Sequence, residues 1–351
     1  MKNKKEVALG TFKIGVNLKS YVFDGKSWKV TQHKFLEALR VIELYKANGA
    51  FDLLIDLKNP KFLKGQMSSD GKAQGGRIFI LPDGKKLDGA FSLFSPGLTI
   101  HDEKSNIHWD VIYLNPSGKF AYHYAMDKKN KSIFKKYKKV HHFEELYPQL
   151  EKKAFRALSV NSDTMAIPFW TLLQTHMRIG NEIYYKAHGH KGLTTLKKKD
   201  IKIKASSVVF SFLGKDGVPQ KIEKNFPKVY ISRLKKILSG KKPSDFVFAN
   251  SRGHLLMEED FKREFKKFIG VEFYPHIVRS YFATSRTEIF LAMNKHPTKT
   301  ETVKFLESVA EELGHKKMSK KTGEWEDSYS VTIGHYIDPK LAGRLKKFMK
   351  K

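Results

Sequence analysis

The 351-residue sequence contains no cysteine. Thiol catalysis, disulfide bonds and cysteine-ligated zinc are therefore excluded. Acidic residues are also scarce: 36 Asp and Glu stand against 66 Lys and Arg, for a formal net charge of +30. The basic excess is spread along the chain, which indicates a broad basic surface and a polyanionic partner, nucleic acid before membrane.

Long apolar runs are missing as well. No stretch approaches the roughly 18–20 apolar residues of a membrane span, and the lysines near residue 1 have no apolar run behind them, so we expect neither a membrane partner nor a signal peptide. The hydrophobic content of 40%, including aromatics at 13%, is that of a folded chain. We expect a soluble intracellular protein, cytoplasmic or nucleoid-associated, or nuclear or virion-borne in a eukaryotic or viral setting.

The first part of the chain, residues 1–140, has the pattern of a β-rich domain. Short apolar runs at 12–16, 78–81 and 109–114 are separated by Asp-Gly, Gly-Gly and Pro-Ser-Gly turn signals. One helix is predicted over 35–46 from its apolar stripe. The lysine-dense segment 128–139 is expected to be a solvated face or a linker.

The second part, residues 141–351, has a helical pattern. Residues 143–158 are amphipathic, and further helices are predicted at 167–180, 228–238, 258–268, 275–293 and 300–313. One β-hairpin interrupts them at 207–221, because Asp216-Gly217 separates two β-like runs and places Lys215 at the tip. The sequence thus predicts an α+β chain, with a β-rich N-terminal domain and a mainly helical C-terminal domain that contains a small hairpin sheet.

Residues 271–284 contain the first sign of a functional site. Pro275 suits the first turn of a helix, and His276 and Arg279 are three residues apart, so both side chains would lie on one helix face. A buried arginine beside a histidine in an apolar helix requires an anion. In so basic a chain, that anion is expected to be phosphate.

Several motifs follow one another in a distinctive order. They are Met177-Arg-Ile-Gly180, Gly192-Leu-Thr-Thr-Leu196, Phe212-Leu-Gly-Lys-Asp-Gly217, His276-Ile-Val-Arg279, Leu313-Gly-His315 and His335-Tyr-Ile-Asp-Pro339. Each motif alone is weak, but their order resembles that of the catalytic domain of the type IB DNA topoisomerases over roughly residues 143–345.

The resemblance implies a catalytic role for five residues. Arg178, Arg279 and His315 would contact the phosphate oxygens, Lys215 would be the general acid for the departing 5′ oxygen, and Tyr336 would be the nucleophile. The implied reaction relaxes supercoiled duplex DNA through a 3′-phosphotyrosyl link, strand rotation and religation.

This chemistry is coherent with the residue types. A phosphodiester under attack gains negative charge on its nonbridging oxygens, and preorganised arginines stabilise that charge. A free phenol has a pKa of about 10, so nearby cations must favour the phenolate. No metal-ligand cluster or phosphate-binding glycine loop is evident in this region, and we expect no cofactor, metal or ATP.

Simpler interpretations exist for each residue. Arg178 would pair with Glu182 if both lay on one helix, and Lys215 would be an ordinary hairpin lysine. Arg279 would be the buried partner of a carboxylate, and His315 would satisfy a helix C-terminus. Tyr329 lies closer to His315 in sequence than Tyr336 does and is the rival nucleophile, within a segment 316–330 that has the composition of an inserted or flexible loop. Tyr336 is preferred because Tyr-Ile-Asp-Pro resembles the family's segment after the nucleophile.

Two alternative functions stay open. His-x-x-Arg at His276 is typical of tyrosine recombinases, which resemble the topoisomerases in fold and chemistry, although the Gly192–Leu196 motif and the short segment after Tyr336 favour a topoisomerase. A noncatalytic DNA-binding protein is the third hypothesis. We assign DNA contacts to His276, Lys191, Lys197 and Tyr281.

The N-terminal domain has no recognised motif. By analogy we expect it to clamp duplex DNA together with the helical domain of the same monomer. His101, His108 and Asp110 could be gathered by a strand as metal ligands, but a surface loop beside a half-buried strand explains them equally, and we assign no metal to them.

Overall fold

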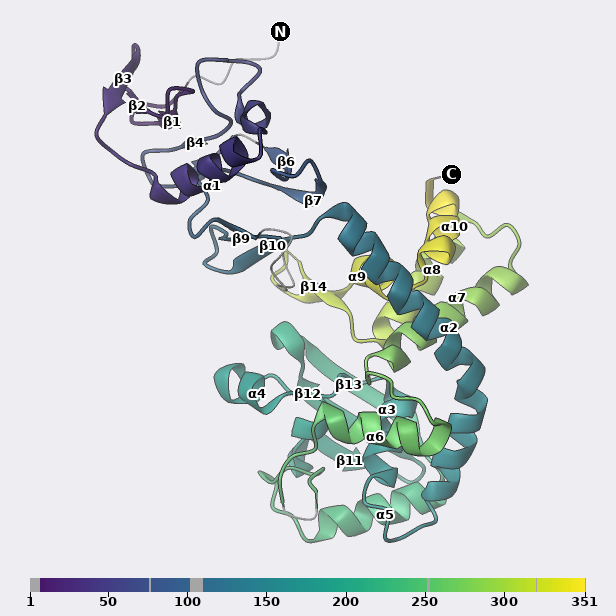
Figure 1. Cartoon of the computed structure of the whole chain (residues 1–351). Helices are drawn as coiled ribbons and strands as arrows, with labels where there is room; N and C mark the ends of the chain where they lie inside the picture. The colour runs from purple at the N-terminus through teal and green to yellow at the C-terminus, as the bar shows by residue number, and fades with distance from the viewer. Residues whose placement is uncertain (1–6, 76, 102–109, 251–252, 320, 351) are drawn as a thin grey trace. The chain divides into compact units, whose positions relative to one another are not determined.

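The chain divides into two compact units, residues 1–135 and 136–351, which are considered separately. The computed structural model (Figure 1) describes residues 7–75, 77–101, 110–250, 253–319 and 321–350. The boundary between the units lies inside one long helix, α2 (Met126–Ala157). In the described part of the chain, no helix has the length and apolarity needed to cross a membrane.

The N-terminal unit is built from small antiparallel sheets and one helix. Its sheets have the strand orders β3-β2-β1-β4-β5, β6-β7 and β10-β9-β8. Its elements are β1 (Phe12–Ile14), β2 (Ser20–Phe23), β3 (Trp28–Thr31), α1 (Leu36–Ala47), η1 (Phe51–Leu54), β4 (Gln66–Met67), β5 (Ala73–Gln74), β6 (Ile78–Ile80), β7 (Lys86–Phe91), β8 (Thr99–Ile100), β9 (Val111–Leu114) and β10 (Phe120–His123).

Helix α1 supplies much of the core of this unit. Ala38, Val41, Ile42 and Tyr45 are buried on one face, and the Tyr45 hydroxyl donates a hydrogen bond to the carbonyl oxygen of Ile80 at 2.5 Å. The predicted helix at 35–46 and the β-rich character of this part are therefore confirmed.

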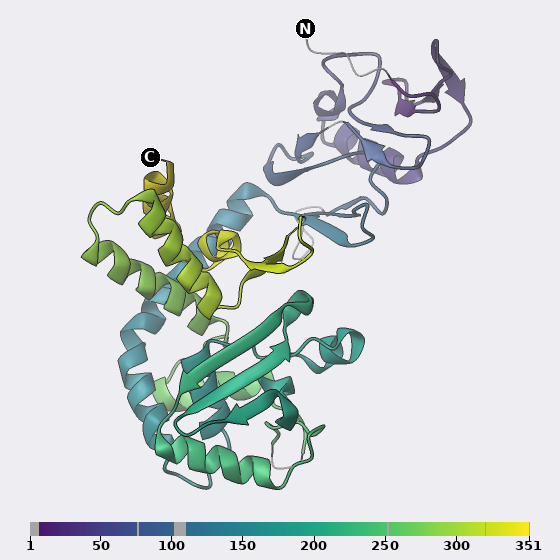
Figure 2. The same cartoon turned by 180° about the vertical axis from the view of Figure 1, so that it is seen from behind.

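The C-terminal unit is mainly helical and contains the predicted hairpin. Figure 2 shows the strands of its three-stranded sheet side by side, in the order β11-β12-β13. Beyond α2, its elements are α3 (Ala166–Thr175), α4 (Glu182–His188), η2 (Leu193–Thr195), η3 (Lys198–Asp200), β11 (Ile201–Ile203), β12 (Ser207–Leu213), η4 (Lys215–Gly217), β13 (Pro219–Asn225), α5 (Lys228–Ser239), α6 (Glu258–Ile269), α7 (Ile277–Met293), α8 (Lys299–Glu312), β14 (Lys316–Met318), β15 (Trp325–Asp327), α9 (Ser330–His335) and α10 (Pro339–Lys350).

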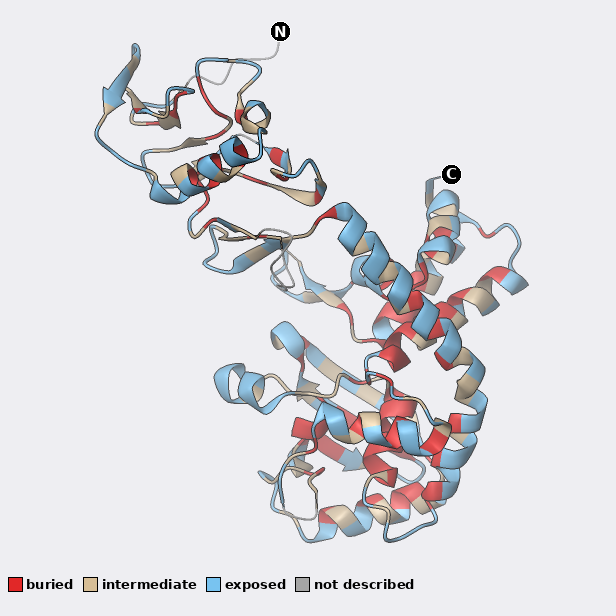
Figure 3. Cartoon of the chain, in the orientation of Figure 1, coloured by how far each residue is buried: buried red, intermediate tan, exposed pale blue. Residues whose placement is uncertain are grey.

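Two groups of side chains form the interior of this unit. Aromatic rings from α2, α3 and α6 pack edge to face, with Phe143, Phe169 and Phe265 all fully buried. A second cluster joins α7, α8, α9 and α10 and includes Leu306, Leu345 and Tyr336. Figure 3 shows that buried residues gather on α3 and α7, one helix from each group.

Three local predictions were wrong in whole or in part. The lysine-dense segment 128–139 is not a linker but part of α2, because Tyr137, Val140 and Phe143 recur at helical spacing and are buried; most of its lysines are exposed, as expected of a solvated face. Helix α3 ends at Thr175 rather than near residue 180, since His176 takes a left-handed conformation.

The third wrong prediction concerns residues 316–330. Instead of a flexible loop, β14 and β15 form a two-stranded antiparallel hairpin that pairs Lys316 with Asp327 and Met318 with Trp325. The backbone N–H of Ser328 then donates to the carbonyl oxygen of His315 at 2.9 Å. The hairpin thus leads the chain from His315 back to helix α9.

Candidate active site

Arg178 lies in the loop between α3 and α4 and is half-buried. The segment that begins at Gly192 holds this loop, because the Leu193 N–H donates to the Arg178 carbonyl at 2.8 Å and the Thr194 N–H donates to the Ile179 carbonyl at 2.7 Å. A Cβ on Gly192 would lie 2.5 Å from the Arg178 carbonyl oxygen. Glycine is therefore required there, which explains the Gly-Leu-Thr-Thr-Leu motif as the support of Arg178.

Arg178 does not pair with Glu182. Glu182 is the first residue of α4 and forms its ion pair with Lys186 at 2.8 Å, while Arg178 lies outside any helix. The one hydrogen bond of the Arg178 guanidinium within the described residues joins its Nη2 to the Tyr336 hydroxyl at 3.4 Å. The same-helix interpretation is thus wrong, and the charge of Arg178 is not neutralised by a carboxylate.

Lys215 lies at the tip of the hairpin formed by β12 and β13, as predicted, and is exposed. The turn requires a positive φ of 61° at Asp216 and 75° at Gly217. Lys215, Arg178 and Arg279 line one cleft of the C-terminal unit. The hairpin therefore presents an ammonium group to the same space as the two arginines.

A glutamine links this hairpin to the Leu-Gly-His segment. Gln220 of β13 donates its Nε2–H to the carbonyl oxygen of Gly314 at 3.0 Å. A Cβ on Gly314 would collide with the Gln220 side chain, and Gly314 also has a φ of 63°. The glycine before His315 therefore allows close approach of the Lys215 hairpin.

Arg279 lies in the first turn of α7 and is only 3% exposed. Its Nη1 donates to the carbonyl oxygen of His176 at 2.5 Å, and its Nη2 donates to that of Leu313 at 2.7 Å and to His315 Nε2 at 3.0 Å. Burial, followed by repulsion from Arg178, lowers the pKa of Arg279 to about 10. The guanidinium is thus fixed without any carboxylate partner among the described residues.

The hydrogen bonds of His315 determine its tautomer. Arginine has only donors, so His315 Nε2 accepts from Arg279, and Nδ1 carries the proton and donates to Thr332 Oγ1 at 2.8 Å. Burial, followed by repulsion from Arg279 and Arg178, lowers the pKa of His315 to about 3. His315 is accordingly neutral, and it orients Arg279 in this structure.

Tyr336 follows α9 and is 5% exposed. Its ring centroid lies 5.1 Å from the Arg279 guanidinium carbon, 4.7 Å from the His315 ring and 5.2 Å from the His276 ring. The structure therefore brings Tyr336 together with Arg178, Arg279 and His315, four of the five predicted catalytic residues.

The charges around Tyr336 change its acidity. Burial alone would raise the pKa of its phenol, but the positive charges of Arg279 and Arg178 outweigh burial and the net pKa is lowered. Tyr137 and Tyr230 are also buried, and their pKa values are raised by burial. Tyr336 is thus the buried tyrosine of the described chain whose phenolate is favoured.

Tyr329 has different surroundings. It is half-buried immediately before α9 and packs on the apolar cluster of α7 to α10. No hydrogen bond or cation–π contact joins it to the arginines in the described part of the chain. Tyr336 therefore has neighbouring arginine charges that favour a phenolate, whereas Tyr329 packs among apolar side chains.

His276 lies at the start of α7, with its ring centroid 5.2 Å from that of Tyr336. Desolvation within the site, followed by repulsion from Arg279 and Arg178, lowers its pKa to about 3. A neutral imidazole at this position could donate one hydrogen bond to a phosphate oxygen.

The other residues assigned to DNA binding have protein partners. Lys191 forms a half-buried ion pair with Asp200 at 2.7 Å, so its charge is neutralised within the protein. Lys197 lies over the rings of Tyr185 and Phe246. Their contact with DNA stays a prediction.

Tyr281 is on α7 and packs against helix α2. Its ring centroid is 4.4 Å from that of Tyr147 and 5.4 Å from that of Phe143. Burial raises the pKa of Tyr281. This packing accounts for its position, and the assignment to DNA binding stays a prediction.

Sequence patterns did not indicate the residues that hold the Tyr336 segment. Lys136 Nζ donates to the carbonyl oxygen of His335 at 2.5 Å and lies 5.5 Å from the centroid of the Tyr336 ring, and burial lowers the pKa of Lys136 to about 8. Tyr137 and Thr284 form further main-chain contacts, to His335 and Tyr336. Every residue has a main-chain carbonyl group, so a contact to that group does not require a particular residue type and leaves no motif in the sequence.

Of the three candidate metal ligands His101, His108 and Asp110, the structure describes two. His108 is outside the described residues, whereas His101 and Asp110 lie at the two edges of that gap and are joined by a backbone hydrogen bond of 2.9 Å.

Comparison with known proteins gives a family match. The family "Eukaryotic DNA topoisomerase I, catalytic core" matches residues 125–332, more than half of the chain. The match includes Arg178, Lys215, Arg279 and His315 and ends four residues before Tyr336. No curated protein matches the chain.

Two solved structures of the site-specific recombinase XerH are similar to the chain in part. The pre-cleavage complex with difH substrate is 20% identical with a TM-score of 0.32, and covers 48% of this chain and 46% of that one. The post-cleavage complex with palindromic difH substrate is 17% identical with a TM-score of 0.33, and covers 58% and 52%. The matched region is about half the length of both recombinase chains.

The neutral state of His315 predicts a pH dependence of stability. Its pKa is about 3 in the fold against an ordinary value of 6.5, so the unfolded chain binds the extra proton between these values. The contribution of His315 to stability is complete above about pH 6.5 and is lost as the pH falls toward 3. We expect the free energy of unfolding of the full chain to fall more steeply with decreasing pH than that of His315→Gln.

The measurement is denaturant unfolding at several pH values between 7 and 4. The difference in slope between the two proteins should approach about 1.4 kcal/mol per pH unit, the limit for one proton. His142→Gln, at an exposed histidine, serves as the control and should keep the wild-type slope. Equal slopes for wild type and His315→Gln would contradict the neutral, buried state.

Proposed function

Because this chain belongs to the family of the eukaryotic DNA topoisomerase I catalytic core, we propose that it relaxes supercoiled duplex DNA by transient cleavage of one strand. The observation that carries the proposal is the position of Tyr336 against Arg178 and Arg279, two guanidinium groups without carboxylate partners among the described residues. A phenol with a lowered pKa next to cations that lack an anion is suited to attack a phosphodiester.

In the proposed cleavage step, Tyr336 Oη attacks the phosphorus atom and the bond from phosphorus to the 5′ oxygen breaks. The phenol loses its proton to solvent water, and the leaving 5′ oxygen takes a proton from the Lys215 ammonium group. The 3′ end is then joined to Tyr336. Religation reverses these bond changes after the free 5′-OH end has rotated, so one phosphoester bond is exchanged for another and no nucleotide is consumed.

The donors left on Arg279 support its role in this step. A guanidinium group has five N–H donors, and three of them are engaged with His176, Leu313 and His315. The buried Nε–H is without a partner among the described residues. We propose that the remaining donors of Arg279, together with Arg178, contact the nonbridging oxygens, and that His315 keeps Arg279 in place or contacts an oxygen itself once DNA is bound.

Contacts to the rest of the duplex are proposed for further residues. His276 lies beside Tyr336 and would contact the same phosphate, while Lys191, Lys197 and Tyr281 would contact neighbouring nucleotides. The N-terminal unit would bind DNA as a clamp in the same monomer. The net charge of +30 supports an extended DNA contact.

The first prediction of the proposed reaction concerns the identity of the nucleophile. Purified protein should relax supercoiled plasmid in EDTA without ATP, and Tyr336→Phe should abolish relaxation and the covalent DNA adduct that denaturant traps. Tyr329→Phe is the matched control and should keep activity within a few-fold of wild type. Loss of activity only in Tyr329→Phe would reassign the nucleophile, and no relaxation by any version with intact duplex binding would favour a site-specific recombinase or a DNA-binding protein.

The second prediction concerns the leaving group. Lys215→Ala should slow cleavage of an ordinary strand by about 10²–10⁴-fold, the range for a lost general acid. A 5′-bridging sulfur leaves as a thiolate and needs no proton, so single-turnover cleavage of such a strand should be near wild type. Lys221→Ala, at an exposed lysine of the same hairpin, is the control. Equal slowing of both substrates in Lys215→Ala would contradict the acid role.

The third prediction concerns Lys136 as a positioning residue. Its charged hydrogen bond to the His335 carbonyl contributes roughly 1.5–3 kcal/mol, so Lys136→Met should slow single-turnover cleavage by about 10–100-fold without changing duplex affinity. Lys136→Arg should recover most of the rate. Lys135→Met, at the exposed neighbouring position, should be neutral. An unchanged rate in Lys136→Met would show that the Tyr336 segment is held without this contact.

A further inference from the structure

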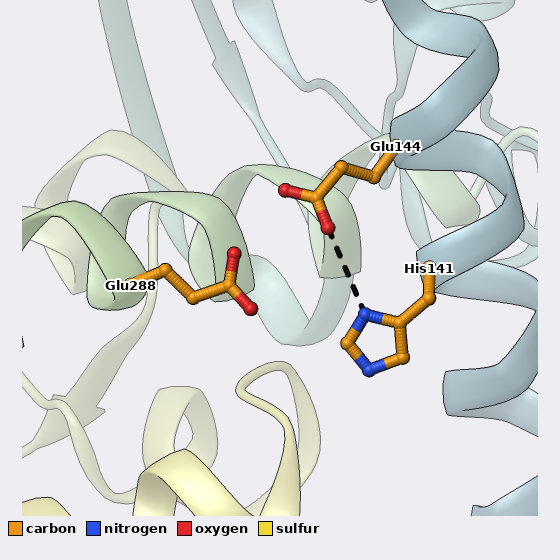
Figure 4. Close-up of side chains that lie close together, drawn as sticks. All are labelled: His141, Glu144 and Glu288. Carbon is orange, nitrogen blue, oxygen red and sulfur yellow. Dashed lines mark ion pairs between the residues drawn. The ribbon is translucent and has the colours of Figure 1, made fainter.

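Three carboxylates surround His141 in a chain that is otherwise strongly basic. His141 and Glu144 lie on α2, Glu288 lies on α7, and Asp338 immediately precedes α10. One ligand atom from each of His141, Glu144 and Glu288 lies within 4.8 Å of the others. Figure 4 shows both glutamate carboxylates directed toward the His141 ring from two different helices.

The contact with Asp338 orients the imidazole. His141 Nε2 is 3.3 Å from Asp338 Oδ2, and since a carboxylate only accepts, Nε2 carries a proton. In the neutral ring the lone pair is then on Nδ1, which lies 3.7 Å from Glu144 Oε2. A carboxylate that holds one nitrogen of a histidine while the other faces oxygen ligands is the arrangement found around metal-binding histidines.

Glu144 and Glu288 approach each other beside His141, whose ligand atom lies close to both carboxylates. The cluster therefore concentrates negative charge between α2 and α7. A dication would neutralise the two glutamates together.

We propose that His141 Nδ1, Glu144 and Glu288 bind one divalent transition-metal ion, of the Zn²⁺ or Mn²⁺ class, with Asp338 holding the histidine in the metal-binding orientation. An imidazole nitrogen among the ligands favours Zn²⁺ over Mg²⁺ and Ca²⁺, and the two carboxylates also suit Mn²⁺. Ligands bound at about 2.0–2.2 Å lie roughly 3–4 Å from one another. Rotation of the two glutamate side chains closes the remaining distance.

A metal ion at this position would also crosslink parts of the fold. The metal would join α2 to α7, and through His141 and Asp338 it would also hold the segment that follows Tyr336. It takes no part in the proposed bond changes, which use no metal. The inference goes beyond the proposed function, and its test uses the full chain without DNA.

A neighbouring pair on the same helix offers a matched control. His142 and Glu145 have the same three-residue spacing, with Nδ1 3.4 Å from Glu145 Oε2. No third metal-ligating side chain joins this pair among the described residues. His142→Ala therefore removes a histidine and glutamate pair from α2 without touching the proposed site.

The experiment is titration of the full chain with Co²⁺ alone, followed by optical absorption of the bound ion, and then displacement with Zn²⁺. We expect one Co²⁺ per chain in wild type and in His142→Ala. His141→Ala and Glu288→Gln should each weaken binding at least 10-fold. Asp338→Asn should weaken it about 10–100-fold, the range for an outer-sphere partner of a metal-binding histidine.

The same measurements can overturn the proposal. Binding of Co²⁺ by His141→Ala with wild-type affinity and stoichiometry would place the ion elsewhere. No binding by folded wild type would leave the cluster as a hydrogen-bonded network around His141 without a metal. We expect the variants to fold, because His141 is exposed and Glu288→Gln conserves the shape of the side chain. Thermal unfolding of each variant without metal verifies this.

Discussion

The buried charge of Arg279 is the constraint on which the candidate site of the C-terminal unit depends. A cation removed from water must be compensated, and a carboxylate is the usual partner. Here two carbonyl oxygens take that role: His176 ends α3 and Leu313 ends α8. The negative ends of two helix dipoles therefore meet at one guanidinium group. Partial charges stabilise the cation without neutralising it, and this leaves its field free to act on Tyr336 and on an incoming phosphate.

Several unusual backbone positions exist to assemble this arrangement. The left-handed conformation of His176 ends α3 early, so that its carbonyl meets Arg279 and the next residues form a loop instead of a further helical turn. Gly192 allows a second segment to pack on that loop within hydrogen-bonding distance. Gly314 does the same where the Lys215 hairpin approaches His315. The glycines of these motifs thus stand where a neighbouring segment, backbone at Gly192 and the Gln220 side chain at Gly314, comes too close for a Cβ.

The sequence predicted the parts of the site that depend on side-chain type or on glycine. The hairpin with Lys215 at its tip, the helix that carries Arg279 and the Leu-Gly-His segment all follow from local patterns, and the structure contains each of them. The end of α3 was missed because the left-handed residue there is a histidine, whereas glycine is the usual signal. The β14–β15 hairpin was missed because its strands are short and polar, with no alternation to indicate a sheet.

Hydrogen bonds to main-chain carbonyl groups could not be predicted from the sequence either, because any residue type supplies the acceptor. In this structure such bonds hold the backbone around Tyr336. Lys136 and Tyr137 hold the His335 carbonyl, and Thr284 holds the carbonyl of Tyr336 itself. All of these bonds fix the backbone, while the phenol has a long contact of 3.4 Å from Arg178. In the proposed reaction the nucleophile approaches phosphorus and later carries it, so its backbone benefits from restraint and its hydroxyl from freedom. A fixed backbone with a loosely held, acidified phenol suits the reversible transesterification that we propose.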